Sequence, residues 1–286
     1  MIIQWYPGHM AKAKRVIGEQ MKVIDVVLEL RDARIPKSSE NPILRELTQN
    51  KPRILVLNKS DLADAEVSAA WKMKFERENI ECVLLDSKAK SSRQELIRRV
   101  MDAGTEILER WQRRGLRARS LRTIILGIPN VGKSTLINTM ARGYVAAIAD
   151  RPGKTRGQQW VKIGKQLELM DTPGVLWPKF DDPQAARKLA ATGAIADEIF
   201  DSEAVVADLL SYLMKYYPSR LCKRYGNDIP NKEIADVIAH IAKQRGCLMP
   251  GGAIDQEKAR RIVLQDFRQG KYGRISLERP EADDEV

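Results

Sequence analysis

The sequence predicts an α/β domain with a mostly parallel sheet, followed by a small all-α domain. Short, nearly continuous apolar runs alternate with helical stretches over the first half of the chain, which is typical of buried parallel strands. From residue 183 onward these runs disappear and only helical patterns remain. We therefore expect two domains, one over residues 1–178 and one over residues 179–286.

Six segments are expected to form strands. Four are apolar, β-branched runs that end at a polar or glycine-containing turn, and they cover residues 23–30, 53–57, 82–85 and 123–126. The other two, 158–163 and 166–170, lie on either side of Gly164-Lys165, and this arrangement predicts a hairpin.

Helices are expected between these strands and throughout the second domain. Helix-forming residues between turn signals place them at 68–78, 92–111, 135–140, 185–196, 202–217, 231–245 and 255–269. In the second domain, four apolar positions are expected to lie in the core: Val205, Leu209, Leu210 and Leu213.

Length and charge narrow the class of protein. A chain of 286 residues suggests about two domains, and 43% hydrophobic residues is a globular value. The 49 basic against 38 acidic residues favour a polyanionic partner such as nucleic acid, although solubility alone can explain such a surplus. Four arginines at helical spacing could track phosphates, with Trp111 beside them in a stacking or core position: Arg110, Arg113, Arg114 and Arg117.

Several classes of protein are disfavoured. The cysteines Cys82, Cys222 and Cys247 are far apart and form no metal-binding or disulfide pattern, so buried, reduced thiols are expected. No apolar run reaches about 18 residues, and the start lacks a signal-peptide pattern. We therefore expect a cytoplasmic protein with no membrane span.

The strongest motif is Gly127-Ile128-Pro129-Asn130-Val131-Gly132-Lys133-Ser134, which follows a predicted strand and precedes a predicted helix. Its glycines let backbone N–H groups close around phosphates, and the helix N-terminus adds positive partial charge. Lys133 can reach the β- and γ-phosphates, and the Ser134 hydroxyl can bind Mg²⁺. Three further residues of this turn are expected to contact the nucleotide: Val131, Gly132 and Thr135.

A second motif, Asp171-Thr172-Pro173-Gly174, follows the last predicted strand. The Asp171 carboxylate can hold Mg²⁺ through water, and the Gly174 amide can sense a γ-phosphate. By itself this turn is common in ordinary loops.

A third motif, Asn58-Lys59-Ser60-Asp61, predicts recognition of guanine. The Asp61 carboxylate can accept hydrogen bonds from guanine N1–H and the exocyclic amine, a donor pair that adenine lacks. Asn58 can bond the edge of the base, and the stem of Lys59 can lie over the ring. A turn after the next strand, at Ser87 and Lys88, could support the base with its backbone amides. All these motifs end strands, where open α/β sheets bind ligands.

These motifs resemble those of the translation-factor class of P-loop GTPases, in the order of the circularly permuted GTPases, whose base-reading half comes first. The opening Trp5-Tyr6-Pro7-Gly8-His9-Met10-Ala11-Lys12, the Asp32-Ala33-Arg34-Ile35-Pro36 turn and the helical C-terminus resemble the RbgA/YlqF ribosome-biogenesis GTPases over nearly the whole chain. The resemblance implies a circularly permuted P-loop GTPase domain, a helical domain that docks on ribosomal RNA, and assembly of the large (50S) ribosomal subunit.

The resemblance also implies a catalytic apparatus. Thr155 resembles the Mg²⁺-binding switch threonine, and its alternative is a plain polar loop residue. Val175 and Leu176, which follow Gly174, cannot orient water through their side chains. In the resembled family a histidine matching His9 is implicated in this task, although His9 could instead pack with its aromatic neighbours or contact RNA. The expected catalytic residues are then His9, Lys133, Thr155 and Gly174.

Asn130 resembles the asparagine that ligates K⁺ in potassium-dependent GTPases, where K⁺ replaces an arginine finger; its alternative is a loop former. We thus expect a monomeric GTPase that uses Mg²⁺ and K⁺, binds GTP and GDP, and is slow until it meets the large subunit or its precursor. Two alternatives stay open: a permuted GTPase that serves the small subunit, and an RNA-binding scaffold with a vestigial nucleotide site. The intact Lys133, Ser134 and Asp171 argue against the scaffold.

Overall fold

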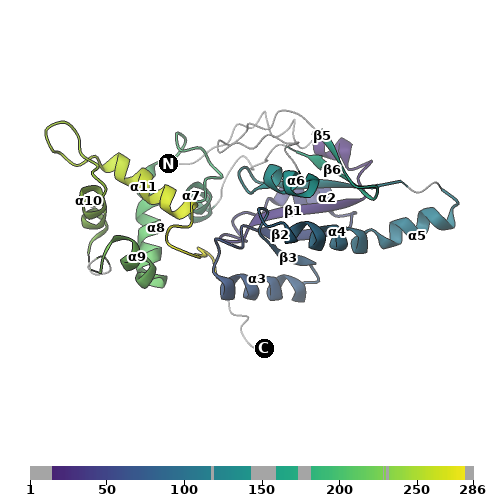
Figure 1. Cartoon of the computed structure of the whole chain (residues 1–286), viewed down its shortest axis with the longest axis horizontal. Helices are drawn as coiled ribbons and strands as arrows, with labels where there is room; N and C mark the ends of the chain where they lie inside the picture. The colour runs from purple at the N-terminus through teal and green to yellow at the C-terminus, as the bar shows by residue number, and fades with distance from the viewer. Residues whose placement is uncertain are drawn as a thin grey trace.

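A computed structural model shows an α/β part and a helical part joined end to end (Figure 1). The structure describes residues 15–116, 119–142, 159–172, 182–227, 229 and 232–280. The α/β part holds the strands and the helices up to α6, and the helical part holds α7 to α11. The predicted fold class is therefore confirmed, while the predicted boundary between 178 and 179 lies outside the described residues.

The sheet has six strands in the order β3-β2-β1-β4-β6-β5. All neighbours are parallel except β5 and β6, which form the predicted antiparallel hairpin. The strands are β1 (Val26–Asp32), β2 (Arg53–Asn58), β3 (Cys82–Leu85), β4 (Leu121–Gly127), β5 (Gln159–Ile163) and β6 (Leu167–Asp171). Because β1 and β4 are neighbours, the sheet joins the two halves of the chain at its centre.

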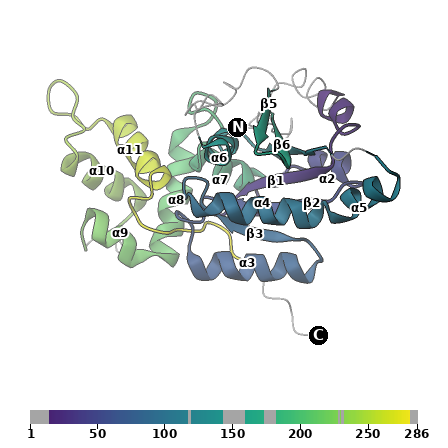
Figure 2. The same cartoon turned by 45° about the vertical axis from the view of Figure 1, so that its right-hand side comes forward.

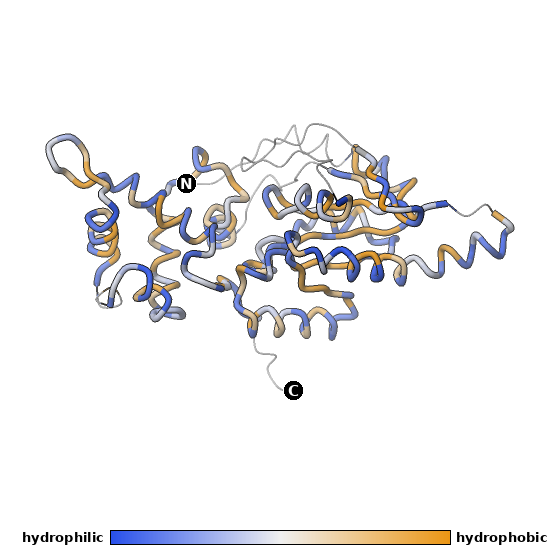
Figure 3. The backbone as a smooth tube through the Cα atoms, viewed as in Figure 1, coloured by the Kyte–Doolittle hydropathy of each residue, from blue (hydrophilic) through white to orange (hydrophobic). Residues whose placement is uncertain are grey.

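Alternating side chains of the strands build two apolar faces. Leu28 of β1 belongs to the core on one face, which α4 and α6 cover, while Val27 belongs to a cluster on the other face with α2. On that second face Leu55 of β2 packs with α3. Figure 2 shows the hairpin of β5 and β6 at the sheet edge opposite α3, and Figure 3 shows how apolar the central strands are.

Ten named helices surround the sheet or form the helical part within the described residues. They are α2 (Pro42–Thr48), α3 (Ala65–Arg77), α4 (Ser91–Ala103), α5 (Thr105–Arg113), α6 (Lys133–Ala141), α7 (Pro183–Ala191), α8 (Ser202–Tyr216), α9 (Pro218–Tyr225), α10 (Ile234–Gln244) and α11 (Gln256–Arg268). Residues 15–20 are also helical. The four apolar residues of α8 predicted for the core are buried, as expected.

Some predicted elements were wrong in extent. The single helix expected over 92–111 is two helices that meet at Gly104, where a Cβ would collide with the side chain of Leu121. The sequence analysis missed α2 and α9, two short helices that begin with proline. The first strand runs on to Asp32, since the buried charges of Glu29 and Arg31 pair with each other at 2.6 Å.

The predicted arginine stripe is shorter than expected. The helix α5 ends at Arg113, and the positive φ of 63° at Gly115 shows that the chain has left the helical path. The stripe therefore contains Arg110, Arg113 and Arg114, all exposed, whereas Arg117 lies outside the described residues. Trp111 is half-buried against the core, with the Arg119 guanidinium 4.4 Å from its ring centroid.

The cysteines and the helices can be compared with the expectations of buried thiols and of no membrane span. Cys82 and Cys247 are buried and free, but Cys222 is only partly buried, because it lies on α9 at the surface of the helical part. Among the helices of the described residues, none has the length and apolar character that crossing a membrane requires.

Candidate nucleotide site

Asn58 joins the base-reading motif to the phosphate loop. It is the last residue of β2 and is buried, and its side-chain amide donates to the backbone oxygen of Val131 at 2.7 Å. Its Oδ1 accepts hydrogen bonds from the backbone N–H and the hydroxyl of Ser87, at 3.0 and 2.7 Å. Three motifs that are far apart in the chain therefore meet at the carboxyl ends of β2, β3 and β4. One N–H of the Asn58 amide, which was predicted to bond the base edge, makes this contact with Val131 within the protein.

Gly132 lets this contact form. Its φ of 107° lies in the left-handed region, and a Cβ at this position would collide with the side-chain amide nitrogen of Asn58. The backbone of the phosphate loop thus passes against the base-reading strand more closely than any larger residue allows. Thr135, two residues after the first residue of α6, is half-buried.

Lys133 begins α6 and is buried. Its ammonium donates to the backbone oxygens of Gly127 at 3.1 Å and Ile128 at 2.9 Å, so it is folded back onto the phosphate loop. Burial lowers the pKa of Lys133 to about 8; Asp171 opposes this shift and the charge of Lys59 adds to it. A bound phosphate would favour the charged ammonium, and Lys133 must therefore gain a proton on binding wherever it is neutral.

We expect this proton to be measurable. With a pKa of about 8, roughly three quarters of Lys133 is neutral at pH 8.5 and only about a tenth at pH 7. Binding of GDP should then take up most of one proton at pH 8.5 and only about a tenth of a proton at pH 7. The affinity for GDP should fall as the pH rises above 8. Calorimetry in buffers of different ionisation enthalpy gives the proton count. An equal count at both pH values would contradict the assignment.

Asp171 and Ser134 lie together, as a Mg²⁺ site requires. Burial raises the pKa of Asp171, while the charge of Lys133 and hydrogen bonds from the Thr172 backbone and the Ser134 side chain oppose the shift. Its Oδ1 is buried and has no hydrogen-bond partner among the described residues. A buried carboxylate oxygen beside a hydroxyl suits a hard cation that keeps most of its water, so these residues fit Mg²⁺.

Asn130 contacts the helical part. This residue has a φ of 55°, and its side-chain amide nitrogen donates to the backbone oxygen of Gly193, just after α7, at 2.8 Å. The contact orients the amide that the sequence analysis assigned to K⁺. It also places the end of α7 against the phosphate loop, which no pattern in the sequence indicates.

The rest of the base-reading loop, residues 59–61, is a turn that an ion pair fixes to the end of β1. Lys59 has a φ of 61°, and its ammonium lies 3.0 Å from a carboxylate oxygen of Asp32. Asp61 is half-buried in the turn that follows, and Lys88 of the neighbouring turn is exposed. In the sequence, Asp32 was assigned only to a turn that resembles one in the family. The signal that could have brought it into the site is an acidic residue just after an apolar, strand-like run. In the structure it ends β1, which pairs with β2.

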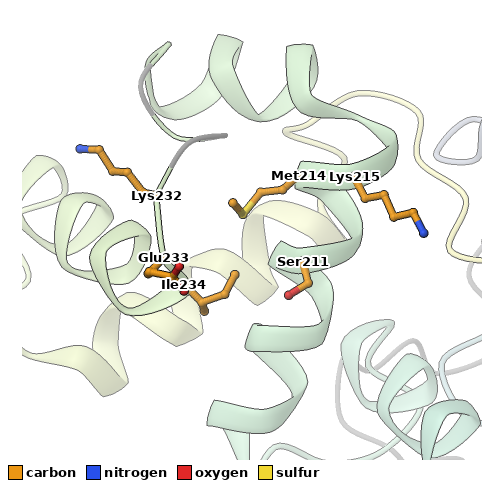
Figure 4. A pocket seen from close by; sticks show the side chains of 6 residues that line it. All are labelled: Ser211, Met214, Lys215, Lys232, Glu233 and Ile234. Carbon is orange, nitrogen blue, oxygen red and sulfur yellow. The ribbon is translucent and has the colours of Figure 1, made fainter.

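Three predicted catalytic residues, His9, Thr155 and Gly174, lie outside the described residues. A shallow hollow of about 420 Å³ lies elsewhere, between α8 and the start of α10 (Figure 4). It is lined by Ser211, Met214, Lys215, Lys232, Glu233 and Ile234, and it contains none of the predicted site residues.

A parallel sheet with a phosphate loop after β4 and a guanine-type motif after β2 defines a P-loop GTPase with a circularly permuted order of motifs. Residues 122–248 match the family described as 50S ribosome-binding GTPase. The chain is 47% identical over 281 residues to Ribosome biogenesis GTPase A of Bacillus licheniformis, covering 98% of this chain and 99% of that relative. It belongs to the ribosome biogenesis GTPase A family, and it is a GTP-hydrolysing enzyme.

More distant relatives match over nearly the whole chain. Mitochondrial ribosome-associated GTPase 1 of Bos taurus is 31% identical over 299 residues, covering 97% of this chain and 89% of that protein. A crystal structure of GNP-bound YlqF from T. maritima superposes with a TM-score of 0.67 at 26% identity, covering 94% of this chain and 99% of the other. The predicted family and the permuted GTPase fold are therefore confirmed.

Proposed function

We propose that this GTPase assists assembly of the large ribosomal subunit, turning over GTP slowly by itself and faster on the particle. The observation that carries the proposal is the Asn58 side chain, which joins the base-reading motif, Ser87 and the phosphate loop into one nucleotide site. The matched family description, 50S ribosome-binding GTPase, supports the large subunit as the partner.

In this proposal the two halves of the chain bind the two ends of GTP. Asp61 reads the guanine, Lys59 covers the ring, and the turn at Ser87 and Lys88 lies beside the base, although its two backbone amides, predicted to support the base, donate to Asn58 and Asp86. Lys133 and the backbone N–H groups of the phosphate loop bind the phosphates, with the residues Asn130, Val131, Gly132, Ser134 and Thr135 around them. Adenine lacks the donor pair that guanine offers, so it would leave the Asp61 carboxylate unpaired and is disfavoured.

Ser134, Asp171 and Thr155 would hold Mg²⁺, which neutralises charge on the β- and γ-phosphates when bound. Asn130 is the proposed K⁺ ligand, and its contact with Gly193 holds the amide in one orientation for that task. Replacing K⁺ by Na⁺ in the assay should then slow turnover while leaving GDP affinity almost unchanged. Equal rates in the two salts would remove K⁺ from the proposal.

Water activation is assigned to the N-terminal stretch. A neutral imidazole at His9 can orient a water near pH 7, and the backbone N–H of Gly174 can contact the γ-phosphate. We propose that contact with the particle completes this arrangement, so that hydrolysis follows docking and ends it.

The exposed arginines of α5 are the proposed RNA contact. The helix projects from the end of the molecule opposite the helical part (Figure 1), and Arg110, Arg113 and Arg114 are all exposed on it. Phosphate contacts of this kind weaken steeply as salt rises.

The decisive experiment is co-sedimentation with separated 30S and 50S particles, with a non-hydrolysable GTP analogue and with GDP. We expect the analogue-bound protein to pellet with 50S particles or their precursors, GDP to release it, and the particle to raise GTP turnover at least about tenfold. Pelleting with 30S particles would favour the small-subunit alternative. Binding that ignores the nucleotide would favour a scaffold.

A further inference from the structure

A buried carboxylate lies directly beneath the base-reading loop. Asp32, at the end of β1, is 1% exposed and accepts hydrogen bonds from Arg34 Nε at 2.9 Å and Nη2 at 2.7 Å. The Arg34 backbone N–H donates to it as well, at 3.0 Å, and Lys59 Nζ lies 3.0 Å away. Burial by itself raises the pKa of Asp32, but the charges of Arg34 and Lys59 outweigh it, so the carboxylate stays ionised.

Lys59 depends on this carboxylate. Its backbone is in the left-handed region, which costs free energy for any residue with a Cβ. Burial lowers the pKa of Lys59, and the nearby charge of Arg34 adds to the shift, while Asp32 opposes it. The Asp32 carboxylate is thus the group that keeps the ammonium charged and in one place beneath the loop.

Arg34 is in turn anchored by the helical part. Its guanidinium carbon lies 5.0 Å from the ring centroid of Phe267 on α11, and its backbone oxygen accepts from the Leu277 N–H at 2.8 Å. The same C-terminal segment also holds the far side of the loop, since the N–H of Ile275 donates to the backbone oxygen of Leu62 at 2.9 Å.

Stability alone does not account for this arrangement. A buried ion pair contributes little net stability compared with apolar residues of the same volume. Arg34 Nη1 is buried with no hydrogen-bond partner among the described residues, which adds a further cost. The charges are therefore better explained by the position that they impose on the loop.

We propose that Arg34 and Asp32 are positioning residues for guanine recognition, and that they link it to the helical part. Phe267 holds Arg34, Arg34 orients the Asp32 carboxylate, and the carboxylate holds Lys59 where its stem covers the base. This inference rests on the proposed binding of guanine by residues 58–61.

The first test compares two identical substitutions in the helical part. Phe267 and Phe200 are both buried, but only Phe267 has its ring against Arg34. Phe267→Leu should weaken GDP binding about fivefold, with kcat at saturating GTP and inhibition by tripolyphosphate unchanged. Phe200→Leu should leave GDP affinity at the wild-type value. Equal affinities of the two variants would overturn the inference.

The second test asks whether the pair acts through Lys59. Asp32→Asn with Arg34→Met removes both charges of the buried pair together and leaves the Lys59 ammonium without its carboxylate, which should weaken GDP binding about tenfold. In a Lys59→Met background the same two changes should have no further effect on GDP affinity. If the losses of GDP affinity were additive in the triple variant, Asp32 and Arg34 would act independently of Lys59 and have only a structural role. A wild-type protein that bound no GDP would instead refute the proposed function.

Discussion

Lys133→Ala is expected to lower GTP turnover by about 10²–10³-fold, because the variant lacks the one ammonium that begins α6 and can move from its backbone contacts to the phosphates. The rate of GTP hydrolysis at saturating nucleotide measures this loss. Nucleotide-free thermal unfolding should change little, since the substitution also removes a buried charge whose pKa is already lowered by burial.

Lys165→Ala is the matched control for that substitution. Lys165 is exposed in the turn between β5 and β6, so removing its ammonium changes net charge equally without touching the phosphate loop. It should keep wild-type turnover. Turnover of Lys133→Ala at the wild-type rate would show that the phosphate loop does not act as assigned.

The substitution Gly132→Ala should disrupt the site just as strongly. The added methyl group collides with the Asn58 amide, which must then give up its hydrogen bonds to Val131 and Ser87. Leaving two or more buried groups unpaired costs about 1–3 kcal/mol each, so GDP affinity should fall about a hundredfold. Titration with a fluorescent GDP analogue measures the affinity.

The control Gly164→Ala separates collision from backbone strain. Gly164 also has a positive φ, of 62°, but nothing lies within 4 Å of the position that a Cβ would take. Both alanines place a Cβ on a backbone of positive φ, which costs about 1–2 kcal/mol at 62° and more at 107°, and only Gly132→Ala meets a neighbour. If the two variants lost GDP affinity equally, the contact between Asn58 and the phosphate loop would not matter for binding.

The sequence predicted most of the scaffold that positions the site. The strands were predictable because nearly continuous apolar runs report burial on both faces of a sheet, and the hairpin because Gly164 marks its turn. Errors occurred where tertiary packing overrode local pattern. Gly104 separates α4 from α5 within a continuous helical pattern, and a Cβ at this position would collide with the side chain of Leu121.

The positions of the site motifs at strand ends were predictable, whereas the contacts of their side chains were not. The phosphate loop and the motif at residues 58–61 are local signatures, so their presence at strand ends was readable. Asn58 was expected at the base edge, and the structure places its amide on Val131, 73 residues away in the chain. Asn130 was read as a cation ligand, and its bond to Gly193, 63 residues away, was not foreseen.

The amino-acid sequence by itself determined the class of this enzyme and the order of its motifs, because each motif depends on neighbours within one strand and turn. Only the tertiary structure decided that Asp32 holds Lys59, that Phe267 holds Arg34, and that the helical part touches both ends of the nucleotide site. Such contacts depend on how distant elements pack, and periodicity along the chain carries no record of that.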